Sequence, residues 1–403
     1  MNSEMVSARS AIEALRAGVP SRHAVAQLGT TQQDIKEHFD DALLSLRAGE
    51  SAKPLVISAN FGGGKSHLLN YLQTVAERQG FVTSFVVISP EMPLGSPHVV
   101  LKALVENAQA PNRIGKALQT LAADASTVTD AFAQLRDWTQ KAAIDGKLKA
   151  LIRLYEEYRV DDELRMKILD DIEGDPLMLT VIKQKLKDIG ELSAYELKAV
   201  PNQSLAHDRI RLYAQFVRAC GSNGLVILFD ETERIAKFSR KQRILAYQEL
   251  GWWRKAAEEA NGAILPVFAM NTVFIQDVRK DEPLFQSAAL GYSQDERDQN
   301  ALDGIAMLNK RYELASVTPE EEEEIKYRVK AIYERAYGVT APNLPNLRDV
   351  RTTVRSQIRR WITYWDLRRY APDYQADVES EAMQFDTREI GDDALFTGDE
   401  TDE

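Results

Sequence analysis

The feature that most constrains the fold is a glycine-rich turn between an apolar run and an amphipathic segment. Residues 54–59 (PLVISA) predict a short buried strand, and residues 65–80 (KSHLLNYLQTVAERQG) have helical spacing. The turn between them holds three consecutive glycines followed by lysine and serine, which lets successive backbone amides point at one anion. This order predicts a phosphate-binding loop in an α/β fold.

The loop departs from the general pattern G-x-x-x-x-G-K-[ST] at its first position. It consists of Ala59, Asn60, Phe61, Gly62, Gly63, Gly64, Lys65 and Ser66. A methyl group is tolerable at the first position, whereas the backbone at Gly64 must pass close to the phosphates. We expect Lys65 to bind the β- and γ-phosphates of ATP and Ser66 to bind Mg²⁺. We count His67 with the nucleotide-binding segment, with local packing as the alternative.

A later apolar run ends in two carboxylates. Residues 225–231 (LVILFDE) predict a buried strand, and open parallel sheets bind ligands at the carboxyl ends of their strands. We therefore expect Asp230 to join the Mg²⁺ shell and Glu231 to orient and deprotonate an attacking water. The next strand, residues 263–271, ends in Asn271, which is expected to hold that water or else to serve only the strand-end turn.

Two arginines are candidates for contacts with the γ-phosphate. Arg311 precedes the C-terminal helical unit, and Arg348 opens a basic segment. We expect one to act from a neighbouring subunit and the other within the chain. Arg351 and Arg355 are rivals because they follow Arg348 at helical spacing.

The pattern along the chain predicts four regions. These are an N-terminal helical arm (1–50), an α/β core with a parallel sheet and a helical insertion at about 97–220 (51–315), a helical lid (316–376) and an acidic tail (377–403). The tail has 11 acidic residues and one basic residue, so the rest of the chain has a net charge near −1. The composition of the tail predicts disorder, and the alternative is a peptide that docks to a partner protein.

Nucleic-acid binding stays open at this stage, because a near-neutral body neither requires nor forbids it. Residues 348–369 carry seven arginines with interleaved aromatics, which would suit phosphates and stacked bases. The alternative is a lid helix whose arginines face ATP, the tail or a neighbouring subunit. DNA is therefore a candidate partner only.

Membrane and secreted classes are disfavoured. No run approaches the roughly 18 apolar residues of a membrane helix, and the first residues lack a signal-peptide core. Cys220 is the only cysteine, which excludes an intrachain disulfide and fits a reducing compartment. We expect a cytoplasmic protein without a membrane partner.

The order of the motifs resembles that of AAA+ ATPases, nearest the origin-recognition and initiator-like branch, over about residues 51–370 without the insertion. Four segments are more specific: IEALRAGVPSRHAVAQLG (12–29), NFGGGKSHLLNYLQ (60–73), VVISPEMPL (86–94) and ILFDETERI (227–235). They resemble the ATP-binding proteins of BREX phage-defence systems, of the BrxD type. The resemblance implies a bacterial defence ATPase that acts with partner proteins.

The sequence thus predicts an ATP-hydrolysing motor or switch that uses ATP and Mg²⁺. An arginine supplied in trans would make the active form a homo-oligomer. The alternative is a nucleotide-gated binding module with little hydrolysis. A related P-loop signalling or transcription regulator is a third possibility.

Overall fold

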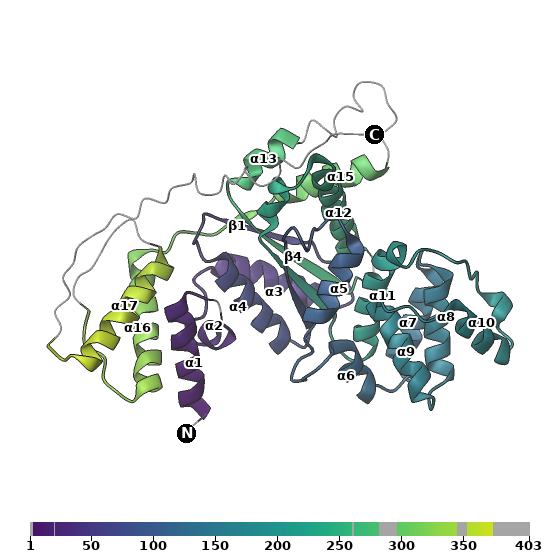
Figure 1. The fold of residues 1–403 in the computed structure, drawn as a ribbon, viewed down its shortest axis with the longest axis horizontal. Coiled ribbons are helices and arrows are strands. Elements are labelled where there is room, and N and C mark those ends of the chain that lie inside the picture. Colours follow the sequence, from purple (N-terminus) through teal and green to yellow (C-terminus); the bar gives the residue numbers. More distant parts are fainter. Residues whose placement is uncertain (1–2, 20, 260–261, 282–295, 345–352, 374–403) are drawn as a thin grey trace, which may run out of the picture.

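A computed structural model describes residues 3–19, 21–259, 262–281, 296–344 and 353–373. Within these residues a five-stranded, all-parallel sheet forms the centre, with strand order β2–β3–β4–β1–β5 (Figure 1). Its strands are β1 (Leu55–Ala59), β2 (Val82–Val87), β3 (Leu225–Asp230), β4 (Ile264–Asn271) and β5 (Tyr312–Glu313). The predicted α/β fold with a parallel sheet is confirmed.

Helices cover both faces of the sheet because alternate residues of its strands point to opposite sides. On β3, Val226 and Leu228 join one core and Ile227 and Phe229 the other. The first core contains α3 (Gln33–Arg47) and α4 (Lys65–Arg78). The second is built from α5 (Pro97–Asn107), α11 (Ala206–Ala219), α12 (Arg240–Glu258) and α15 (Glu296–Asn309).

The segment between β2 and β3 is helical and extends to one side of the sheet (Figure 1). Besides α5 and α11 it contains α6 (Ala117–Asp124), α7 (Asp130–Lys141), α8 (Gly146–Glu157), α9 (Asp162–Glu173) and α10 (Leu179–Asp188), with short 3-10 helices at Leu192–Ala194 and Asn202–Leu205. Its apolar residues are continuous with the α5–α11–α12 core. This insertion is therefore packed onto the sheet domain through a shared core.

The first and last described helices lie side by side (Figure 1). A third core joins α1 (Ser3–Ala17) and α2 (Arg22–Leu28) to α16 (Pro319–Tyr337) and α17 (Val354–Tyr370). Arg16 Nη2 lies 2.8 Å from Asp366 Oδ2, and Tyr333 donates to Asp366 Oδ1. The sequence predicted one arm for residues 1–50, but α1 and α2 pack with the lid helices whereas α3 packs on the sheet.

Two linkers connect this arm–lid unit to the sheet domain, one after α2 and one after β5. The Gln32 side chain joins them, since its amide donates to Ala315 O (3.1 Å) and its oxygen accepts from Ala315 N (2.8 Å). None of the described helices is long and apolar enough to cross a membrane. The predicted tail (377–403), Arg348 and Arg351 lie outside the described residues.

Candidate nucleotide site

The glycine-rich loop connects β1 to α4, as its sequence predicts. Gly62 (φ +73°) and Gly64 (φ +93°) have left-handed backbone conformations, which residues with a side chain rarely adopt. A Cβ on Gly63 would lie 3.0 Å from both Ala59 Cβ and Asn60 O. The middle glycine, Gly63, therefore leaves room for the methyl group of Ala59, which explains how the loop accommodates alanine at its first position.

The loop and the acidic end of β3 meet directly. Ser66 Oγ donates to Asp230 Oδ2 at 2.7 Å, and Asp230 Oδ1 accepts from the Glu231 amide at 2.9 Å. Asp230 is buried and Ser66 half-buried. A hydroxyl and a carboxylate this close are an oxygen ligand pair of the kind that Mg²⁺ takes together with phosphates. The residues present thus fit the predicted metal position.

Lys65 and Asn271 also lie at this edge of the sheet. Lys65 Nζ is 3.5 Å from Ala59 O, and Ala59 is the register partner of Asn271 on β4. Asn271 Oδ1 accepts from the Val273 amide at 3.0 Å, so its oxygen serves the turn after β4. The structure brings together the residues predicted at the ends of β1, β3 and β4.

Glu231 has an unusual backbone for a residue other than glycine. Its φ of 60° and ψ of 34° lie in the left-handed region, at the N-cap of a 3-10 helix (Thr232–Lys237, η3). Its carboxylate Oε2 accepts from Arg234 Nε at 2.5 Å. Strained backbone at a site of this kind is a common mark of functional residues.

Sequence reasoning missed a third carboxylate, that of Glu233. Burial raises the pKa of Glu233, and the positive charge of Lys65 and the backbone N–H of Asn271 oppose that rise. Glu233 therefore lies near both groups, and its buried Oε2 has no hydrogen-bond partner within the described part of the chain. The signal was present as the second acidic residue after Asp230 in the sequence DETE.

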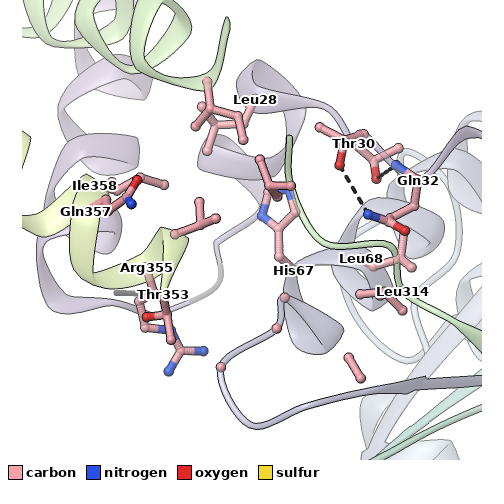
Figure 2. Close-up of a pocket in the computed structure, with 18 of the residues that line it drawn as sticks. Leu28, Thr30, Gln32, His67, Leu68, Leu314, Thr353, Arg355, Gln357 and Ile358 are labelled. Carbon is pink, nitrogen blue, oxygen red and sulfur yellow. Dashed lines mark hydrogen bonds between the residues drawn. The ribbon is translucent and has the colours of Figure 1, made fainter. Parts of the chain in front are cut away.

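A cavity of about 780 Å³ opens beside the loop, between the sheet domain and the arm–lid unit (Figure 2). In Figure 2, Thr353 and Arg355 at the start of α17 lie on one side, Gln32 and Leu314 on the other, and His67 between them. The loop lines it with all of its members from 59 to 64. Apolar residues line another part: Leu15, Leu28, Ile325 and Ile358.

His67 contacts the arm from the first turn of α4. Its Nε2 donates to Gly29 O at 2.8 Å, and burial lowers the pKa of the imidazole although this hydrogen bond opposes the shift. A neutral imidazole fixed in this way lines the cavity. The side chain therefore links the phosphate loop helix to the linker after α2.

Of the arginines considered for the γ-phosphate, the structure describes Arg311 and Arg355, which lie in different places. Arg311 lies just before β5, where its Nη2 is 2.7 Å from Glu313 Oε1, and it is outside the residues that line the cavity. Arg355, the rival on α17, does line the cavity. A Cβ on Gly62 would lie 3.1 Å from Thr353 Cγ2, so the start of α17 closely approaches the loop.

Comparison with known families agrees with these features. The model of the BREX system ATP-binding protein family BrxC/D matches residues 5–123 and 119–357. No curated protein and no solved structure gave a match. The matched segments include the arm, the phosphate loop, the acidic end of β3 and Asn271. Because they span most of the sequence, this chain belongs to the BrxC/D family of BREX system ATP-binding proteins.

Proposed function

We propose that the chain hydrolyses ATP as a AAA+-type motor or switch of the BrxD type, within a phage-defence assembly of several proteins. The observation that carries the proposal is the hydrogen bond between Ser66 Oγ and Asp230 Oδ2. It joins the phosphate loop to the acidic end of β3, which is the arrangement that phosphoryl transfer to water requires. Family membership supports ATP as the nucleotide.

The residues have distinct roles in this proposal. Lys65 and the amides of the loop bind the phosphates, and α4 directs its positive N-terminal end at them. Ser66 and Asp230 would hold Mg²⁺, which when bound neutralises charge on the phosphate oxygens. Glu231 deprotonates the attacking water, and Asn271 helps to place it.

The cavity provides room for the rest of the nucleotide. Its volume of about 780 Å³ falls within the usual size of ligand pockets, and its apolar residues suit a purine base. Arg355 of the lid takes the role within the chain for which Arg348 was the first candidate. Nucleotide binding would thus engage the sheet domain and the arm–lid unit together, which couples the nucleotide to the position of the lid.

Replacement of Lys65 with alanine tests nucleotide binding. We expect the affinity for Mg·ATP to fall by about 10- to 100-fold, because charge-assisted hydrogen bonds to the phosphates are lost. Isothermal titration calorimetry measures this, with Lys53→Ala as a control because Lys53 is exposed and precedes β1. Equal affinities of wild type and Lys65→Ala would contradict the phosphate-loop assignment.

Arg311 is proposed to act on the nucleotide of a neighbouring copy of the chain. Within the described residues its Nε has no hydrogen-bond partner, and its Nη2 is 2.7 Å from Glu313 Oε1. Arg311→Ala should lower phosphate release by about tenfold or more and leave ATP affinity unchanged. Glu313→Gln, which leaves the arginine in place, is the matched control. Wild-type turnover of Arg311→Ala would refute the assignment.

One observation favours the second function, a nucleotide-gated module with little hydrolysis. Within the described residues the Glu231 carboxylate accepts a hydrogen bond from Arg234, whereas Ser66 donates to Asp230 and Lys65 to Ala59 O. Phosphate release with and without DNA separates the two functions. Mass measurement with and without ATP and DNA reports assembly and nucleic-acid binding.

A further inference from the structure

The 3-10 helix after β3 provides a rigid base for the side chains next to the predicted water-activating glutamate. Thr232 and Ile235 of this helix are fully buried, so the helix is fixed against β4, α12 and α13 (Phe274–Asp281). Glu231 and Arg234 are on its outer side, and each side chain is 42% exposed. The helix therefore presents both groups toward solvent from a fixed backbone.

The Glu231 carboxylate has one side-chain partner within the described residues, Arg234, at 2.5 Å. The Glu231 and Glu233 carboxylates repel each other. This repulsion contributes to the raised pKa of Glu233, after the larger effect of burial. Without Arg234, a half-exposed side chain beside another carboxylate would sample several rotamers.

Another carboxylate, that of Glu91, lies within the electrostatic reach of Arg234. The loop after β2 carries Glu91, whose carboxylate Oε2 accepts from Ser89 Oγ at 2.8 Å. The positive charge of Arg234 lies near enough to contribute to the lowered pKa of Glu91, after the hydrogen bonds from Ser89 and from the Glu91 amide. The hydrogen bond that locates the guanidinium is therefore the one to Glu231.

We propose that Arg234 is a positioning residue that orients the Glu231 carboxylate for its reaction with water. The inference rests on the proposed ATP hydrolysis. A general base is commonly oriented by a third group, and a small misplacement of a reacting group is costly in rate. The left-handed backbone of Glu231 sets the direction of its side chain, and Arg234 fixes its end.

Turnover of four variants tests the proposal: Arg234→Ala, Arg234→Lys, Glu231→Gln and the double variant Arg234→Ala/Glu231→Gln. We expect Arg234→Ala to lower kcat by at least about tenfold with KM for ATP unchanged. Lysine retains the positive charge of arginine but lacks its planar guanidinium with several fixed donors. Arg234→Lys should therefore have a kcat between those of Arg234→Ala and wild type. Lys237→Ala is the matched control, because Lys237 is an exposed cation of the same 3-10 helix.

The double variant separates positioning from a general structural role. If Arg234 acts through Glu231, the Arg234→Ala substitution does not lower kcat further once Glu231 is glutamine. The losses of kcat in the two single variants are then not additive in the double variant. Additive losses overturn the proposal, as does a kcat of Arg234→Ala equal to or above that of wild type. A loss of kcat in Lys237→Ala as large as that in Arg234→Ala also overturns it.

Wild-type activity distinguishes failure of this inference from failure of the proposed function. If the wild-type chain in its assembled form releases no phosphate from ATP, the proposed hydrolysis is wrong and this inference falls with it. If the wild type is active and Arg234→Ala is equally active, only the role of Arg234 is wrong. Thermal unfolding of each variant confirms that the compared proteins are folded.

Discussion

Replacement of Glu231 with glutamine is expected to lower ATP turnover by about 10²–10⁴-fold while ATP binding is retained. Glutamine keeps the size of the side chain but cannot take a proton from water. Binding should persist because Lys65 and the loop amides are unchanged. The phosphate-release rate and the ATP affinity, measured on the same preparation, give the two quantities to be compared.

Glu233→Gln is the informative companion variant, since Glu233 is the other glutamate near Lys65. If Glu231 is the base, Glu231→Gln has the larger loss of the two. Wild-type turnover in Glu231→Gln would contradict the assignment. A large loss in Glu233→Gln alone would instead give the role to the carboxylate that sequence reasoning missed.

The second large effect is expected on stability, at a buried charge cluster in the insertion. Asp171 accepts from Lys147 Nζ at 2.5 Å and from Arg209 Nη2 at 2.7 Å, and its side chain is 0% exposed. Arg209 Nε donates to Asp171 O at 2.6 Å, so the cluster joins α8, α9 and α11. Asp171→Ala would leave two buried cations without their shared anion.

We expect Asp171→Ala to lower the free energy of unfolding of the insertion by about 3–5 kcal/mol, because the uncompensated charges remain buried. Chemical denaturation followed by circular dichroism measures the loss. Asp162→Ala on the same helix is the control, since its side chain is 93% exposed; it should cost less than about 1 kcal/mol. A loss of that small size in Asp171→Ala would contradict the argument.

Much of the site could be predicted because its signals are local. A strand, three glycines and a helix start occupy a short stretch, and the acidic end of β3 follows an apolar run directly. β5 was not predicted, since two residues, Tyr312 and Glu313, are too few to show a period. That Arg355 lines the cavity could not be predicted from spacing, because helical spacing does not say which arginine faces a loop in another part of the chain.

The sequence by itself determined the glycine-rich loop between β1 and α4, the parallel sheet and the identity of the residues at its carboxyl edge. These depend on backbone freedom, side-chain period and the rule that parallel strands end at one edge. Only the tertiary structure decided that α1 and α2 share a core with the lid, that Gly63 makes room for Ala59, and that Arg234 binds Glu231. Such contacts depend on which surfaces meet and at what distance, and neither is encoded in the spacing of residues along the chain.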